Sequence, residues 1–277
     1  MEEKIVLTPV DFTEVSEYAI IHAVEMAKSI DAKVILLHIV KDGGEIKKAR
    51  QKLQVHMDEL SEKYPDVAIQ SIIRIGDIYN DISNAAIENG AHLIIMGTHG
   101  MKGAQFLTGS RALKVVGDSE VPFLIIQKGL PDFKGINNIL VPLTLEKYTK
   151  QKLSHVKFIA KYFDSKVILT VPKEKDEFLR NKLTRDLKYS EQYFKEAEIP
   201  YEGFEIDGNN EVESYLNLVD DYKIDLFIVM NHSEGLFPTI SNSVQDIITN
   251  KKKVPVFLIN PLSTSSISIL GNYAGVG

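Results

Sequence analysis

The chain has 277 residues, of which 44% are hydrophobic and 25% charged, a composition that is typical of a globular protein with ample core. Its formal net charge of −6 argues against nucleic-acid binding, because phosphate recognition needs a concentrated basic surface. It contains no cysteine, which excludes disulfides and cysteine-ligated metals, and its 7 histidines are scattered without an HxxxH-type pair. The N-terminal residues resemble neither a signal peptide nor a membrane span, so we expect a cytoplasmic protein.

Short apolar runs alternate with helix-period segments along the first half of the chain. The apolar runs are nearly continuous, which is typical of parallel strands buried on both faces. The alternation predicts an α/β fold with a doubly wound, five-stranded parallel sheet. We expect strands at 4–9, 33–39, 67–74, 92–97 and 122–127, and helices at 14–30, 44–63, 78–90 and 109–119.

The second half repeats this plan. The run that begins at Leu7 returns at Leu140, and the run that begins at Val121 returns at Val254, so both pairs are 133 residues apart. The apolar run 93–96 matches 227–230, at an offset of 134. Solenoid repeats have periods of about 20–50 residues, so this much longer period indicates a duplicated domain. In the second half we expect strands at 138–142, 166–171, 201–206, 225–230 and 255–259, and a long helix at 174–197.

A segment with glycine and proline at 128–135 separates the two repeats and predicts a linker. We therefore expect one domain at 1–128 and a second domain at 136–262. The residues 263–277 are rich in serine and glycine, have no counterpart in the first repeat, and are expected to form a tail.

The loops after the first and fourth strands carry the residues of a candidate ligand site. Open parallel sheets bind ligands beyond the carboxyl ends of their strands, where the strand order reverses. The fourth strand is followed by a glycine-rich turn with Gly97 and Gly100, and Gly109 and Ser110 then enter a predicted helix. Exposed amides on such a turn, together with a helix N-terminus, can hold phosphate groups.

This arrangement resembles the universal stress protein family. The ATP-binding members of that family carry Gly-xx-Gly, nine residues, and then Gly-Ser or Gly-Thr. The segments 10–13, 34–39 and 121–126 are similar to three further motifs of the family, in the same order. The resemblance covers the first repeat throughout and the second in outline. It implies two tandem domains of the adenine-nucleotide α-hydrolase-like fold.

The resemblance also implies an adenine-nucleotide site in the first repeat, for ATP or for AMP or ADP, with Mg²⁺ as a further candidate. By this resemblance Asp11 contacts the nucleoside, the backbone of Ile39 recognises adenine, and Met96 lines the pocket. The complete set of expected binding residues is Pro9, Asp11, Ile39, Met96, Gly97, Gly100, Gly109 and Ser110.

Several residues of this site have a second interpretation. Asp11 can instead start the first helix, where a carboxylate is stabilised by free N–H groups. Eight residues separate Gly100 from Gly109, one fewer than in the family pattern. His99 is interpreted as a loop residue beside the ligand, since no carboxylate in these motifs is placed to orient it as a base.

The second repeat departs from the family pattern at the same two loops. Thr144 stands in the place of Asp11, and the segment 231–234 replaces 97–100 and brings in Glu234, whose carboxylate would repel phosphate. We therefore expect a structural second domain that pairs with the first within one chain; a homodimer of whole chains remains a further alternative.

Three functions are weighed from these observations. The first is a regulatory, nucleotide-binding protein of the stress response, and the second is a structural or adaptor protein that binds no nucleotide. The third is an ATP-using enzyme, and it is disfavoured because the sequence has no GxxxxGK[ST] phosphate loop and no evident carboxylate cluster for Mg²⁺. We expect a protein that is not an enzyme, with slow ATP hydrolysis left open.

Overall fold

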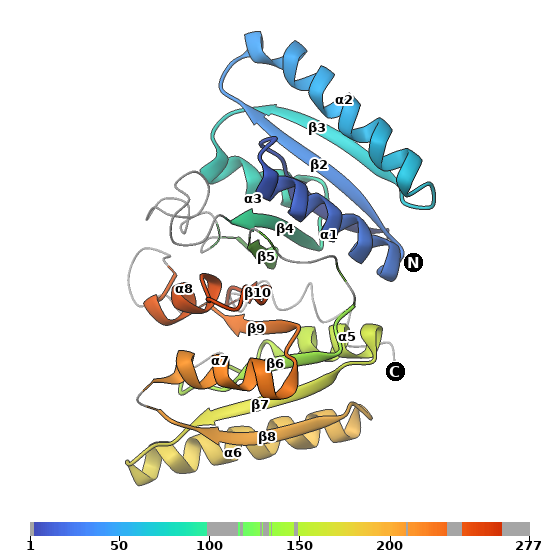
Figure 1. Cartoon of the computed structure of the whole chain (residues 1–277). Coiled ribbons are helices and arrows are strands. Elements are labelled where there is room, and N and C mark those ends of the chain that lie inside the picture. Colours follow the sequence, from blue (N-terminus) through green and yellow to red (C-terminus); the bar gives the residue numbers. More distant parts are fainter. Residues whose placement is uncertain are drawn as a thin grey trace. The chain divides into compact units, whose positions relative to one another are not determined.

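The computed structural model falls into two compact units, which are described one at a time (Figure 1). Unit 1 comprises residues 1–134, 233–240 and 248–256, and unit 2 comprises residues 135–232, 241–247 and 257–277. The domain boundaries expected from the sequence remain a prediction. The structure describes residues 3–98, 116, 119–127, 129, 133, 135–146, 149–208, 210–231 and 240–261.

Unit 1 is a parallel sheet with the strand order β3-β2-β1-β4-β5. The apolar runs that were expected to be strands are indeed strands, and most side chains of β1, β2, β4 and β5 are buried. The side chains of the edge strand β3 are partly buried or exposed. The expected helix at 109–119 lies almost wholly outside the described residues. The elements are β1 (Lys4–Pro9), α1 (Glu14–Ile30), β2 (Ala32–Val40), the 3₁₀ turn η1 (Gly43–Glu45), α2 (Ile46–Lys63), β3 (Ile69–Ile75), α3 (Ile78–Glu88), β4 (Leu93–Thr98) and β5 (Phe123–Gln127).

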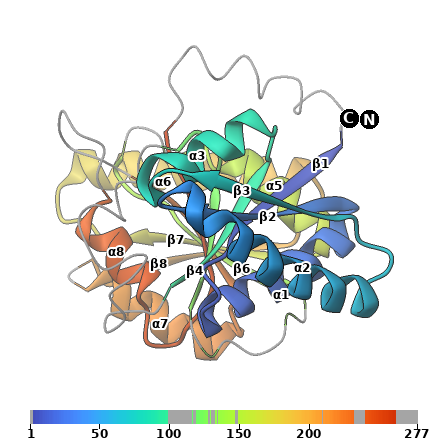
Figure 2. The same cartoon turned by 90° about the horizontal axis from the view of Figure 1, so that it is seen from above.

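The helices of unit 1 cover both faces of its sheet. Parallel strands are connected by right-handed crossovers, so the side on which a helix lies depends on the direction in which the chain moves along the sheet. The chain moves from β1 to β2 to β3 in one direction and then crosses back to β4. Figure 2 accordingly shows α1 and α2 on one side of the sheet and α3 on the other. The unit is therefore doubly wound, as predicted.

Unit 2 repeats this architecture. Its strand order is β8-β7-β6-β9-β10, and α5 and α6 lie on one side of the sheet with α7 on the other (Figure 2). The elements are β6 (Asn138–Pro142), α5 (Leu153–Phe163), β7 (Lys166–Pro172), α6 (Glu177–Glu196), β8 (Tyr201–Ile206), α7 (Glu211–Tyr222), β9 (Leu226–Met230), α8 (Asn242–Ile248) and β10 (Val256–Ile259).

The strand registers correct one detail of the repeat. Val6 of β1 pairs with Leu93, and Ile139 of β6, 133 residues after Val6, pairs with Leu226. The offset along β4 and β9 is therefore also 133, and the offset of 134 taken from the similar apolar runs is wrong. Two four-residue apolar runs can be aligned equally well one residue apart, whereas the backbone pairing admits one register. By this register Met230 is the counterpart of Gly97.

The first helix of each unit ends at equivalent positions but begins at different ones. α1 ends at Ile30 and α5 at Phe163, and each is closed by an aspartate in the left-handed conformation, Asp31 and Asp164. α1 begins at Glu14, whereas α5 begins at Leu153, which corresponds to position 20 of the first repeat. The two units therefore differ at the loop that follows their first strand.

Candidate functional site

The carboxyl ends of β1 and β4 define the switch point of unit 1. β1 and β4 are neighbours, but the chain leaves β1 toward β2 on one side and leaves β4 toward β5 on the other. The two connecting loops therefore diverge and leave a crevice between them, which is where open α/β sheets bind their ligands.

A narrow recess lies at this switch point. It is lined by Pro9, Asp11, Met96 and Gly97, together with residues of the first turn of α1. These four residues were all expected from the sequence, and the structure brings them together. The volume between the described residues is about 10 Å³, which is space for a single water molecule.

Asp11 shapes the turn that starts α1. Its Oδ1 accepts hydrogen bonds from the backbone N of Thr13 at 3.0 Å and from Thr13 Oγ1 at 2.6 Å. Thr13 is the N-cap of α1, and its side chain accepts a bond from Ser16 N. Asp11 therefore orders the turn before α1, whereas the N-cap itself is Thr13. Asp11 also lines the recess, so one carboxylate holds the turn and faces the crevice.

Phe12 has a strained backbone that its aromatic neighbours hold in place. Its φ is 62°, in the left-handed region that residues other than glycine seldom adopt. The ring lies 4.6 Å from the ring of His38 and stacks on that of His56 at 5.5 Å, and Lys52 Nζ lies 4.8 Å from its centroid. β2 and α2 thus fix the turn that presents Asp11. No residue pattern predicted this strain.

Gly97 allows α1 to approach β4 closely. A Cβ at this position would lie 2.5 Å from both Cγ1 and the carbonyl oxygen of Val15. Such distances do not occur between real atoms, so any side chain here would displace the first turn of α1. Gly97 was expected to contact phosphate; the structure gives this glycine a packing role next to the recess.

Ile39 lies in β2 outside the lining of the recess, but its backbone faces the same end of the sheet. In a parallel strand the backbone groups of successive residues point to opposite neighbours. Leu37 O accepts a bond from Val10 N on the β1 side, and Val40 O accepts one from Gly76 N on the β3 side. The N–H and C=O of Ile39 therefore point to the β1 side, beyond the last β1–β2 pair, Pro9 with Leu37.

Three expected binding residues, Gly100, Gly109 and Ser110, lie outside the described residues, and so does His99. Among the residues that the structure does describe, no group of three or more histidine, aspartate or glutamate side chains could hold a metal ion. The same described part of the chain contains no helix that is long and apolar enough to cross a membrane.

Two ionisable side chains beside the turn, Glu17 and His56, are partly buried. Oε1 of Glu17, on α1, lies 3.4 Å from Nε2 of His56. Burial raises the pKa of Glu17, the nearby His56 opposes that rise, and the negative charges of Glu59 and Asp11 add to it. The carboxylates of Glu17 and Asp11 thus influence each other across the first turn of α1.

Unit 2 fills the equivalent place with its own side chains. Lys152, directly before α5, is 2% exposed, and its Nζ donates a hydrogen bond to the carbonyl oxygen of Pro142, the counterpart of Pro9. Burial lowers the pKa of Lys152 to about 8. The side chain of Met230, 3% exposed, stands in β9 where Gly97 stands in β4. α5 also begins later than α1 does relative to the repeat.

The loop after β6 is also closed on itself. The backbone N of Thr144, the counterpart of Asp11, donates to Thr149 Oγ1 at 3.2 Å, and Lys182 Nζ of α6 donates to the carbonyl oxygen of Leu145. In unit 2, therefore, hydrogen bonds within the protein engage the backbone N of Thr144 and the carbonyl oxygen of Leu145. These two residues follow β6 as residues 11 and 12 follow β1 in unit 1.

Comparisons with known proteins agree with this geometry. The model of the universal stress protein family matches residues 3–127. Two universal stress proteins of Methanocaldococcus jannaschii, MJ0577 and MJ0531, are each 28% identical to this chain over 45% of its length and over 95% and 82% of their own. The crystal structure of a universal stress protein from Archaeoglobus fulgidus aligns with a TM-score of 0.75 at 18% identity, covering 94% of this chain and 99% of that chain.

The fold is thus a doubly wound α/β fold that occurs twice in the chain, with a recess at the switch point of unit 1. Residues 3–127 belong to the universal stress protein family. The fold class and the family expected from the sequence are confirmed, and unit 2 repeats the fold.

Proposed function

We propose that unit 1 binds an adenine nucleotide, ATP or AMP, across the carboxyl ends of β1 and β4, and that the protein acts as a nucleotide-responsive regulator rather than as an enzyme. The observation that carries this proposal is the recess at the switch point, where Pro9, Asp11, Met96 and Gly97 meet. In this proposal the backbone groups of Ile39, which point past the end of β1, would bond an adenine edge.

In this proposal the nucleotide lies over the recess, with the adenine toward β2 and the phosphates toward the loop after β4. Asp11 accepts a hydrogen bond from the ribose, because a carboxylate matches a sugar hydroxyl. Gly100, Gly109 and Ser110 would donate backbone N–H groups and a hydroxyl to the phosphates. The small volume of the recess means that it receives one edge of the ligand, and the rest of the ligand lies above it.

We assign no nucleotide to unit 2. The buried side chains of Lys152 and Met230 already occupy the corresponding place. The amine of Lys152 donates a hydrogen bond to the carbonyl oxygen of Pro142. A ligand would have to displace a buried side chain and leave its hydrogen-bond partner unsatisfied, at a cost of about 1–3 kcal/mol. Unit 2 is therefore structural in this proposal.

Titration calorimetry of the full chain with ATP and with AMP tests the proposal. We expect one nucleotide per chain with a Kd below about 1 mM. Gly100→Glu should abolish binding and leave the far-UV circular dichroism unchanged, because a carboxylate would repel the phosphates. Gly43→Ala, on η1, is the control and should bind normally.

The alternative is a structural or adaptor protein that binds no nucleotide. The shorter glycine spacing and the small recess favour it. The absence of any binding by the unmodified chain at about 1 mM nucleotide would establish this alternative, whereas turnover of ATP above about 1 s⁻¹ would contradict both.

A further inference from the structure

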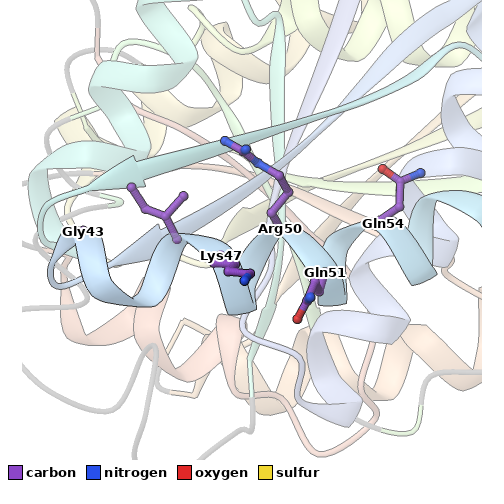
Figure 3. A pocket seen from close by; sticks show the side chains of 6 residues that line it. Gly43, Lys47, Arg50, Gln51 and Gln54 are labelled. Carbon is purple, nitrogen blue, oxygen red and sulfur yellow. The ribbon is translucent and has the colours of Figure 1, made fainter.

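A concave surface on α2 lies away from the switch point. It has a volume of about 500 Å³ and is lined by Gly43, Ile46, Lys47, Arg50, Gln51 and Gln54 (Figure 3). These six residues are called the α2 groove. From Ile46 to Gln54 the helix rises about 12 Å, the length of about four residues of extended chain.

The α2 groove is separate from the recess of unit 1. Lys52 and His56 of the same helix face Phe12, beside the turn of Asp11. At 100° per residue, Arg50 and Gln54 project from α2 about 160° away from Lys52. A ligand in the α2 groove would therefore not contact the proposed nucleotide site.

The α2 groove is basic in a chain whose net charge is −6. The first half of α2 carries Lys47, Lys48, Arg50 and Lys52, and residues 46–57 include no aspartate or glutamate. Cations in the first turns of a helix are disfavoured by the helix dipole, so this placement costs stability. The stability of the helix therefore does not explain why these cations lie in its first turns.

The acidic groups nearest in sequence bond to backbone N–H groups and not to these cations. Glu45 accepts a hydrogen bond from the backbone N of Lys41 at 3.0 Å, and Asp42 accepts one from Gly44 N at 2.8 Å. Within the described part of the chain, neither Lys47 nor Arg50 forms an ion pair. Arg74 on nearby β3, by contrast, binds both Asp81 and Glu88.

The amide side chains indicate what kind of anion fits. Gln54 Nε2 donates to Asp58 Oδ1 at 2.8 Å, so Gln54 Oε1 is the atom of this amide that could accept a hydrogen bond from a ligand. Gln51 offers both a donor and an acceptor. A peptide group also has one donor and one acceptor, whereas a phosphate at neutral pH offers acceptors almost exclusively. A carboxylate matches the guanidinium fork of Arg50.

We propose that the α2 groove binds a short acidic segment of a partner protein in an extended conformation. Arg50 and Lys47 would pair with carboxylates that lie one helical turn apart, and Gln51 and Gln54 would bond to the peptide backbone between them. This interaction does not depend on the nucleotide site. It gives a chain whose net charge is −6 a basic surface that attracts acidic segments of other proteins.

Fluorescence anisotropy with a labelled peptide of six glutamates tests the proposal on the full chain. We expect binding that weakens as salt is added, because the charges are exposed. Arg50→Gln should weaken binding about fivefold, which corresponds to about 1 kcal/mol for an exposed pair. Lys48→Gln is the matched control, since it removes one charge from the same helix outside the α2 groove, and it should change the affinity by less than about twofold.

Other results would overturn the proposal. Equal weakening by Arg50→Gln and Lys48→Gln would show diffuse charge attraction without a site. Binding of inorganic tripolyphosphate without binding of the glutamate peptide would show a phosphate site. Calorimetry with ATP separates the two proposals: Arg50→Gln should leave nucleotide binding unchanged, and a parallel loss would place the α2 groove within the nucleotide site.

Discussion

Gly97 in β4 lies against Val15 in the first turn of α1, so closely that a single added carbon would overlap the carbonyl oxygen of Val15. The two residues set the distance between the strand and the helix whose ends border the recess. In unit 2 the register places Met230 at the position of Gly97, and the helix begins later in the chain. The two units thus differ both in the residue at this strand position and in the start of the helix.

The first prediction concerns this contact. Gly97→Ala should lower the free energy of unfolding by about 1–3 kcal/mol, because α1 must move away to admit the methyl group. It should also weaken nucleotide binding, because the first turn of α1 lines the recess. Urea unfolding and calorimetry measure the two effects. Gly43→Ala is the control: its Cβ would have only one neighbour, at 4.0 Å, and unchanged stability is expected there.

The second prediction separates the two roles of Asp11. Asp11→Ala removes the acceptor of Thr13 N and Oγ1 and should cost about 1 kcal/mol of stability together with most of the nucleotide affinity. Asp11→Asn keeps an oxygen acceptor and should retain the stability, while the loss of charge lowers affinity for the ribose. If both variants bound nucleotide as well as the parent chain, Asp11 would have only its helix-starting role.

The third prediction concerns Lys152. Its pKa is about 8 in the folded protein and 10.5 when exposed. Between these values the unfolded chain binds more protons than the folded one, so stability should rise as the pH increases from 8 to 10.5, by up to about 3 kcal/mol. Below pH 8 the cost of the buried ammonium is fully present. Lys152→Met should remove this rise, and urea unfolding at pH 7, 8.5 and 10 measures it.

A rise of equal size in Lys152→Met would assign the pH dependence to other groups. The carbonyl oxygen of Pro142 loses its donor in this variant. We therefore expect the absolute stability at pH 7 to change little, since the lost hydrogen bond offsets the removed charge. The change in the pH dependence is what identifies Lys152.

Much of the fold could be predicted because its signals are local. The continuous apolar runs predicted the strands, and the helix-period segments between them predicted the helices. The duplication was evident from the spacing of similar runs. The register of β9 was misplaced by one residue, since Leu226 and Phe227 are both apolar and only the pairing with β6 distinguishes them.

The site was predicted in part. Pro9, Asp11, Met96 and Gly97 were expected from motifs and do meet in space. The left-handed Phe12 and the buried amine of Lys152 were missed, because neither contact leaves a local sequence pattern. Phe12 is held by rings of β2 and α2, and Lys152 bonds to a carbonyl at the end of β6. The α2 groove was missed as well, since charges at helical spacing usually form an ordinary solvated face.

A crystal structure of the full chain grown with ATP tests the central claim most directly. We expect nucleotide density at the carboxyl ends of β1 and β4, with the adenine against the backbone of Ile39 and the ribose at Asp11. Nucleotide density at the ends of β6 and β9, with the recess of unit 1 empty, would contradict the account.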